Sequence, residues 1–340
     1  MILADFTPET IQKNSTMNAP PKESIRVDAD LLAAFVTSCL ENAGLRQAEA
    51  KQIGQLLSSN DLRGVFSHGT RQVRSYVSHF KNGRLNPAPE VCILNESPTT
   101  MVFDGDGSLG YFAAHKAARA VVPKAKEMGV AIAVTRNHGH IGAAGLYSRI
   151  VMEEGLIGYV TSGAQMHLQP ERLMLGAGGG SPHSFGIPAG EAPGLLLDFG
   201  AMHDIYHDTG KKIFDLAPGV VFRSLGLGTI CQTLGGLLCG VPADENKASP
   251  KWQGANQGSF ILALDIERFI PRETFLAEME DYNQLVSQMQ PLPGCDKPYL
   301  PGGLEAERFA AWKEEGVPVG KEHRQLLEDV GKEMAVPLEL

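Results

Sequence analysis

The sequence of 340 residues has no excess of basic charge. Its 30 Lys and Arg residues are outnumbered by 39 Asp and Glu residues, which gives a formal net charge of -9. Such a chain has no general basic field for a phosphate backbone or an anionic membrane, so we expect no nucleic-acid or membrane partner. No apolar run reaches the roughly 18 to 20 residues that cross a bilayer, and the first residues lack the pattern of a signal peptide.

Cysteine is scarce, and the five cysteines are scattered without a Cys-x-x-Cys pair. This pattern fits free thiols in a reducing compartment better than a disulfide framework, so we expect a cytoplasmic protein. The sequence also lacks a Gly-x-Ser-x-Gly nucleophile turn and a Walker A loop. Nothing in it therefore indicates a serine hydrolase or an NTPase.

Four segments follow from composition and periodicity. Residues 1–25 are polar and aperiodic and predict an N-terminal arm. Residues 26–90 have apolar side chains at helical spacing, and we expect this segment to pack with further helices in residues 265–340. Residues 91–264 alternate strand-like and helix-like patterns and predict a central sheet domain. The fold class is therefore mixed α/β, of the α+β kind, with helical parts at both ends of the chain.

Individual elements can be placed within these segments. Asp28 is a candidate cap for a first helix that Gly44 would end. Val91–Phe103 predicts a hairpin, because turn-forming residues separate two strand-like runs. Leu225–Leu238 predicts a buried helix because its residues are mostly apolar.

Gly105–Gly110 has the spacing Gly-x-Gly-x-x-Gly between a strand-like run and a helix, which is the arrangement of a Rossmann dinucleotide site. However, the next strand ends in Thr135 and Arg136 rather than in an acidic residue, and no second half of such a fold is evident. The alternative is a tight turn in which glycine supplies positive φ angles.

Two histidines, His138 and His140, lie in a glycine-flanked loop at the expected carboxyl end of a strand, where α/β proteins gather their sites. An imidazole there can act as a general acid or base, because its pKa lies near neutral pH. The alternative is that both histidines are exposed or brace the loop.

Ser67, His68 and Arg71 place a hydroxyl, an imidazole and a guanidinium within five residues of a short turn. Together they could orient a small carboxylate and pair with its charge. Helix capping with surface salt bridges is the alternative explanation. His203 and His207 could share one helix face, but no third metal ligand can be named, so we expect no metal site.

In combination these motifs resemble the type 2 malate/L-lactate dehydrogenases. This is a non-Rossmann group that includes ureidoglycolate dehydrogenase, diketogulonate reductase and piperideine-carboxylate reductase. The resemblance covers residues 26 to about 336. The shared landmarks, in chain order, are Asp61–Gly64 with Ser67–Gly69, Tyr76, Gly83–Pro87, Asp104–Gly110, Asn137–Ala143 with Tyr147, Leu197–Asp198, Gly226–Leu227, Asn256–Gly258 and Leu300–Gly302.

The resemblance implies a homodimeric oxidoreductase that uses NAD or NADP on a small 2-oxo, 2-hydroxy or cyclic imino acid. It implies a mostly antiparallel central sheet in place of a Rossmann fold. His140 matches the family's proton donor and acceptor, and Ser67 and His68 match residues that face the substrate. The cofactor contacts implied by position are Asp198, Phe199, Gly200, Arg223 and Ser224.

Two departures from the family pattern affect the expected site. Gln72 stands where the family has an arginine, so Arg71 would have to bind the substrate carboxylate. The segment between Asp198 and Arg223 is shorter than in the family. The alternative function is therefore a family-fold protein with a degraded nicotinamide site, which carries out a non-redox reaction or binds a ligand through His68 and His140.

Overall fold

The computed structural model describes residues 18–205, 209–248, 250–293 and 295–338. The chain divides into two compact units, each of which is described by itself. The first unit comprises residues up to Asn82, Gly190–Pro193 and the residues from Ala277 on. The second comprises Gly83–Ala189 and Gly194–Leu276. Residues 1–17 of the expected arm lie outside the described residues.

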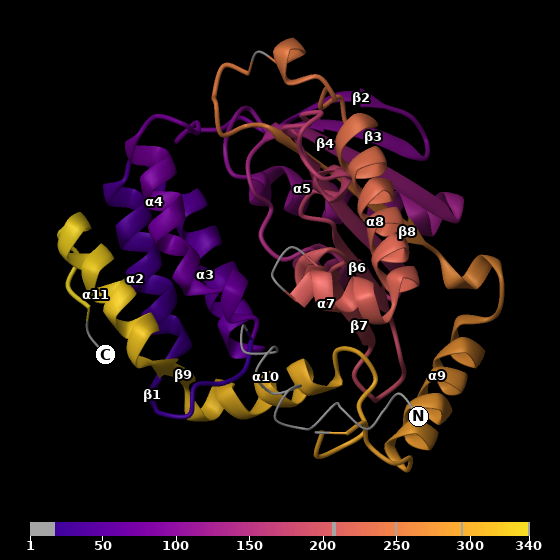
Figure 1. Ribbon diagram of the computed structural model, residues 1–340. Coiled ribbons are helices and arrows are strands. Elements are labelled where there is room, and N and C mark those ends of the chain that lie inside the picture. Colours follow the sequence, from indigo (N-terminus) through magenta and orange to yellow (C-terminus); the bar gives the residue numbers. More distant parts are fainter. Residues whose placement is uncertain (1–17, 206–208, 249, 294, 339–340) are drawn as a thin grey trace. The chain divides into compact units, whose positions relative to one another are not determined.

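The first unit is built mainly from helices (Figure 1). Helix α2 begins where the sequence predicts, because the Asp28 carboxylate accepts hydrogen bonds from the backbone N–H groups of Asp30 and Leu31. Its apolar face is buried, and Gly44 follows it with a φ of 102°. The elements of this unit are α2 (Ala29–Asn42), α3 (Gln47–Leu62), η1 (Phe66–His68), η2 (Thr70–Gln72), α4 (Val73–Lys81), α10 (Gly303–Glu315), α11 (Lys321–Met334) and the antiparallel pair β1 (Ser24–Val27) and β9 (Val317–Gly320).

The second unit contains a seven-stranded sheet in the order β2-β3-β4-β8-β5-β6-β7. Only β3 and β4 pair in parallel among these strands, so the expectation of a mostly antiparallel sheet is confirmed. The predicted hairpin is β2 with β3. The strands are β2 (Cys92–Glu96), β3 (Thr100–Asp104), β4 (Val130–His138), β5 (Ile157–Ala164), β6 (Pro182–Ile187), β7 (Leu195–Gly200) and β8 (Gln257–Leu264).

Helices cover both faces of this sheet. On one face, Ser148 of α6 (Gly145–Glu153) shares a 2.7 Å hydrogen bond with Ser184 of β6, and α5 (Gly110–Met128) packs beside it. On the other face, Thr161 of β5 donates a hydrogen bond to Cys231 of α8 (Pro218–Gln232). The remaining elements are η3 (Met174–Gly178), η4 (His203–Ile205), α7 (Thr209–Leu216), η5 (Thr233–Leu237), η6 (Glu245–Lys247), η7 (Ile266–Arg268) and α9 (Arg272–Ser287), which runs across the sequence boundary of the two units.

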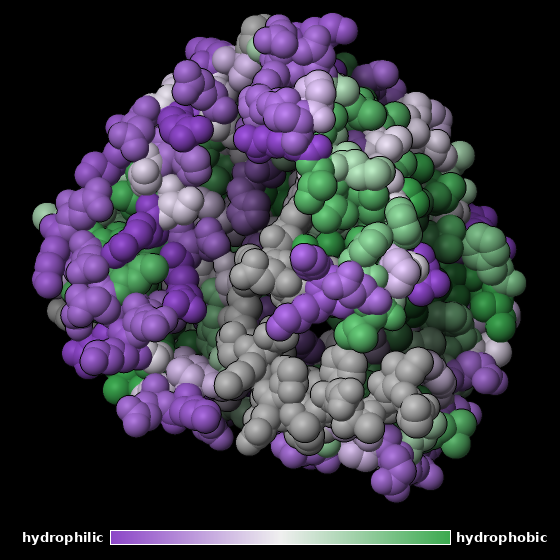
Figure 2. All heavy atoms as spheres, viewed as in Figure 1, coloured by the Kyte–Doolittle hydropathy of each residue, from purple (hydrophilic) through white to green (hydrophobic). Residues whose placement is uncertain are grey.

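The prediction of a buried helix over Leu225–Leu238 is wrong in part. Helix α8 begins earlier, with Pro218 in its first turn, and ends in the π-helical turn η5. One side packs on the sheet, but several large apolar side chains point to solvent, namely Val220, Phe222, Leu227, Ile230, Leu237 and Leu238. Apolar composition alone does not distinguish a buried helix from one with an uncovered face. Figure 2 shows apolar residues gathered over α8.

The stretch Pro218–Leu237 is also long and apolar enough to cross a membrane by length and composition, with 39% of it buried. This is weak evidence for a membrane span, because core helices of soluble proteins meet the same criterion.

Strand β5 and turn η5 approach each other at backbone distance. A Cβ atom on Gly163 would lie 2.5 Å from the backbone nitrogen of Gly236, and one on Gly235 would lie 2.6 Å from the nitrogen of Gly163. Gly163, Gly235 and Gly236 therefore allow the turn η5, which follows α8, to lie directly on the sheet.

We expect Gly163→Ala to lower the free energy of unfolding by about 1 to 3 kcal/mol, because the new methyl group has only backbone to displace. Urea unfolding followed by circular dichroism measures this change. Gly176→Ala is the matched control, because nothing lies within 4 Å of its Cβ position. Equal stability of the two variants would contradict the close approach.

Candidate functional site

His140 lies in the loop that joins β4 to α6, and this loop is fixed from several sides. Gly145 donates its backbone N–H to the Asp198 carboxylate at 2.8 Å. The Tyr147 hydroxyl donates to the carbonyl of Ile141. Asn137 adopts a φ of 54°, a conformation that non-glycine residues seldom adopt and that often marks functional sites. The half-buried His140 is therefore presented by a rigid loop at the end of a strand.

His138 braces this loop. It is fully buried, and its Nδ1 donates to the carbonyl of Gly139 at 2.8 Å. Its Nε2 then accepts from the hydroxyl of Thr135 at 2.7 Å, and Thr135 is bonded to the hydroxyl of Ser259. Burial lowers the pKa of His138 to about 4, so the ring is neutral at ordinary pH. His138 therefore follows the alternative interpretation, in which a histidine braces the loop and takes no part in acid–base chemistry.

The Gly-x-Gly-x-x-Gly segment is a packed turn. A Cβ on Gly107 would lie 2.0 Å from the Trp252 ring, and one on Gly110 would lie 2.5 Å from the His138 ring. The backbone N–H groups of Gly105, Gly107 and Gly110 donate to carbonyls of the loop 136–140 rather than pointing into open space. Although β3, α5 and β4 form a βαβ unit, β4 then pairs antiparallel with β8. The Rossmann interpretation is therefore wrong, and the tight-turn alternative is right.

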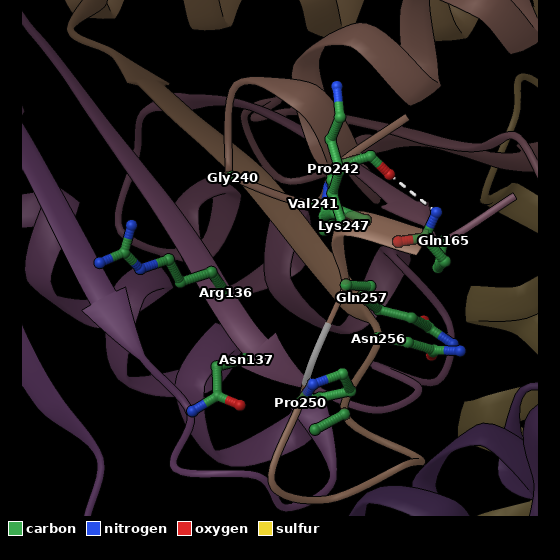
Figure 3. A pocket seen from close by; sticks show the side chains of 12 residues that line it. Arg136, Asn137, Gln165, Gly240, Val241, Pro242, Lys247, Pro250, Asn256 and Gln257 are labelled. Atoms are coloured by element: carbon green, nitrogen blue, oxygen red, sulfur yellow. Dashed lines mark hydrogen bonds between the residues drawn. The ribbon is translucent and has the colours of Figure 1, made fainter. Parts of the chain in front are cut away.

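A pocket of about 350 Å³ adjoins this loop (Figure 3). No Asp or Glu lines it, and its two cations, Arg136 and Lys247, have no ion pair within the described residues. Arg136 belongs to β4, and Figure 3 shows it at the left of the labelled residues, with the Lys247 side chain extending at their top. The lining residues are Arg136, Asn137, Gln165, Gly240, Val241, Pro242, Lys247, Ala248, Pro250, Ala255, Asn256 and Gln257. Sequence reasoning did not identify this pocket, because its residues come from three distant segments.

Ser67, His68 and Arg71 lie close together in the first unit. The Ser67 hydroxyl and His68 Nδ1 are 2.9 Å apart. Gln72 donates from its Nε2 to the Ser67 carbonyl at 2.6 Å. Arg71 lies 3.8 Å from the exposed Glu322, so the surface salt bridge of the alternative interpretation is present. An exposed pair of this length is weak and does not prevent Arg71 from binding another carboxylate.

The expected cofactor residues all lie in the second unit. Asp198, Phe199 and Gly200 end strand β7, while Arg223 and Ser224 lie on α8, where Arg223 is exposed. The Asp198 carboxylate accepts the N–H of Gly145, so this side chain holds the His140 loop.

Sequence reasoning also missed His183, which connects the two groups of expected cofactor residues. Its ring stacks on Phe199 with centroids 5.5 Å apart. Its Nε2 donates to the carbonyl of Leu227 on α8 at 3.1 Å, while Nδ1 accepts from the Tyr159 hydroxyl at 2.9 Å. Burial lowers the pKa of His183, which keeps it neutral in this role.

The two histidines considered as metal ligands cannot both be placed. His203 lies in η4, and His207 lies outside the described residues. Among the described residues, no group of three or more His, Cys, Asp or Glu side chains could hold a metal ion.

Comparison with known protein families identifies the family of this chain. The family model described as malate/L-lactate dehydrogenase matches residues 27–202 and 212–328. The chain belongs to this family. It is accordingly an oxidoreductase of the dehydrogenase class that acts on CH–OH groups. The resemblance inferred from the sequence motifs is thereby confirmed.

Individual relatives cover nearly the whole chain. The malate dehydrogenase of Pyrococcus horikoshii is 26% identical over 92% of this chain and 96% of the relative. The L-sulfolactate dehydrogenase of Methanocaldococcus jannaschii is also 26% identical, over 90% of this chain and 96% of the relative. The solved structure of the Pyrococcus horikoshii enzyme superposes with a TM-score of 0.80 at 24% identity, covering 94% of this chain and 98% of that one, which shows a shared fold.

We expect the buried neutral His138 to make folding sensitive to acid. Its pKa in the folded state lies below that of an unfolded imidazole, so its contribution is present above about pH 6.5 and is lost as pH falls towards about 4. Between these values the wild type should lose up to about 3 kcal/mol more unfolding free energy than His138→Gln. Urea unfolding at several pH values measures the difference, and His167→Gln, at an exposed histidine, is the control. Equal pH slopes for wild type and His138→Gln would contradict a neutral, buried ring.

Proposed function

We propose that this protein transfers a hydride between NAD or NADP and a small 2-oxo or 2-hydroxy carboxylic acid, or a small cyclic imino acid. The observation that carries the proposal is the rigid His140 loop beside a pocket with two unpaired cations, in a chain of this dehydrogenase family. Curated relatives named malate and sulfolactate dehydrogenases support an acid substrate.

The residues present fit a nicotinamide nucleotide. Phe199 offers a flat apolar ring beside Gly200, whose Cβ position has no atom nearer than 3.4 Å. Arg223, at an exposed position on α8, is available for a phosphate, with Ser224 next to it. When bound, the nicotinamide supplies or accepts the hydride.

The chain's own residues would handle the proton and the carboxylate. His140 donates a proton to the oxygen of the reduced carbonyl and removes it in the reverse direction. Ser67 and His68 orient the substrate, and Arg71 pairs with its carboxylate. Arg136 and Lys247 raise the local concentration of anions beside the His140 loop, because no acidic side chain in the pocket offsets them. The alternative of a degraded nicotinamide site is not supported by the comparisons.

We expect His140→Ala to lower kcat by about 100-fold or more, the usual contribution of a general acid or base. Reduction of 2-oxo acids, followed by the loss of reduced-nicotinamide absorbance, measures this change. Binding of NADH or NADPH, followed by nicotinamide fluorescence, should be retained, because the loop is fixed by Asp198 and Tyr147 rather than by the removed ring. Full activity of the variant would contradict the role of His140, and failure of the wild type to bind either nucleotide would contradict the proposed function.

We also propose that the protein is a homodimer that uses the exposed face of α8. Phe222, Gly226 and Ile230, four residues apart, form one stripe along α8, and Phe222 and Ile230 are 60% and 49% exposed; Arg223 lies beside this stripe. Gly226 has nothing within 4 Å of its Cβ position, so a second helix can approach closely. Uncovered apolar faces of this kind commonly bind another protein surface. The family resemblance implies a homodimer, and the net charge of -9 disfavours an anionic membrane as the partner of this face.

A charge on this face should separate the subunits, because a lysine would be buried unpaired in the interface. Size-exclusion chromatography with light scattering should give a dimer for the wild type and a monomer for Ile230→Lys. Leu94→Lys is the control, since Leu94 is 46% exposed on β2. A dimeric Ile230→Lys variant would exclude this face.

We also propose that the protein is located in the cytoplasm. Cys39, Cys231 and Cys239 are free and buried, which suits a reducing compartment.

A further inference from the structure

The turn that carries Ser67, His68 and Arg71 is attached to a buried carboxylate. Asp61, at the end of α3, is fully buried. Its Oδ2 accepts hydrogen bonds from the backbone N–H of Thr70 at 2.9 Å and from the Thr70 hydroxyl at 2.5 Å. The neighbouring Asn60 donates from its Nδ2 to the carbonyl of His68 at 2.9 Å. The end of α3 therefore determines where the turn lies.

The other carboxylate oxygen of Asp61 has no hydrogen-bond partner, although it is buried. It lies against Gly69, where a Cβ atom would be only 1.7 Å from Oδ1. Gly69 therefore leaves the space that this oxygen occupies. An ionised carboxylate with an unsatisfied buried oxygen is unfavourable, and a protonated one is less so.

The hydrogen-bond chain continues to a second titratable group. The Thr70 hydroxyl lies 3.0 Å from Nε2 of the buried His323 on α11. When Asp61 is ionised, the Thr70 hydroxyl donates to it and accepts from His323. When Asp61 is protonated, its proton can be donated to Thr70, whose hydroxyl then donates to the other tautomer of His323. The donor-to-acceptor direction of these hydrogen bonds can therefore reverse without any of the three side chains moving.

We propose that Asp61 is a positioning residue for the Ser67–Arg71 turn, and that its charge sets how strongly Arg71 attracts the substrate carboxylate. The second half rests on the proposed function, in which Arg71 binds that carboxylate. Asp61 is bonded to the backbone N–H of Thr70, the residue before Arg71, so its ionisation places a buried negative charge near Arg71 and lowers the positive potential that Arg71 presents to an anionic substrate.

Arg71 is the charged group that most affects the pKa of Asp61. The Arg71 cation lowers the pKa of Asp61, and so do the two hydrogen bonds from Thr70, but burial outweighs these effects and raises the pKa to about 7. Burial and the Arg71 cation lower the pKa of His323 to about 4, so this ring is neutral near pH 7. Other titratable groups reach this region from neighbouring elements: His323 of α11 is linked to Asp61 through Thr70, Glu322 of α11 lies 3.8 Å from Arg71, and Arg308 of α10 lies against Gly64, while Arg63 and His68 are close to Asp61 along the chain.

The consequence is a pH-dependent substrate affinity. As pH rises from about 6 to about 8, Asp61 loses its proton, and the KM for a 2-oxo acid should rise about fivefold with little change in kcat. Imidazoles ordinarily titrate in the same range, so the informative quantity is the difference between wild type and Asp61→Asn. Asn has nearly the shape of Asp and can accept both Thr70 hydrogen bonds, but it carries no charge.

The first experiment measures KM and kcat from about pH 6 to about pH 8 for wild type, Asp61→Asn and Arg71→Ala. We expect the rise in KM in the wild type only. Arg71→Ala should have a raised KM without that rise, because the charged group that responds to Asp61 is gone. A rise of KM in Asp61→Asn equal to that of the wild type, or one that persists in Arg71→Ala, would overturn the proposal.

The second experiment does not depend on activity. In protein labelled with ¹⁵N-threonine, the Thr70 amide resonance should titrate with a midpoint near pH 7, because its N–H is bonded to Asp61. In Asp61→Asn this titration should disappear. An unshifted Thr70 resonance in the wild type would overturn the proposal even if the protein is an active dehydrogenase. A normal titration in a protein that reduces no 2-oxo acid would refute the proposed function and the affinity effect, and would leave the positioning role of Asp61 standing.

Discussion

The geometry of the second unit depends on four backbone hydrogen bonds that join two loops. The turn between β3 and α5 donates from Gly105, Gly107 and Gly110 to the carbonyls of residues 136, 137 and 140. In return, Gly139 donates to the carbonyl of Ser108 at 2.7 Å. These bonds need close approach of two backbones, which is why the turn is rich in glycine. They hold His140 in place before any ligand is present.

A buried polar group stabilises one loop in each unit. These loops are the His140 loop in the second unit and the Ser67–Arg71 turn in the first. In the second unit the neutral His138 links the loop to Thr135 and Ser259 in the sheet. In the first unit Asp61 links the turn to Thr70 and His323. Such groups are costly to bury unless hydrogen bonds satisfy them, so each network favours one geometry of its loop. The two differ in that Asp61 retains an unsatisfied oxygen and that burial raises its pKa to about 7, while burial lowers the pKa of His138 to about 4.

Short-range patterns predicted much of the fold and several parts of the site. The Asp28 cap, the hairpin of β2 and β3 and the helical ends of the chain follow from local propensity, which acts between residues close in sequence. The same patterns failed where the outcome depends on distant residues. The Gly105–Gly110 spacing permits both a phosphate site and a packed turn, and Trp252, more than 100 residues away, fills the space at Gly107.

The sequence by itself determined the family, the mixed α/β class and the polar motifs around His140 and Ser67, because these depend on residue identity and spacing along the chain. Only the tertiary structure decided that His138 braces the loop while His140 remains half-buried, and that Asp198 holds this loop through Gly145. It also decided that Arg136 and Lys247 share an acid-free pocket and that the charge of Asp61 lies near Arg71. Burial, pairing and pKa are properties of neighbours in space, and the order of residues along the chain does not specify those neighbours directly.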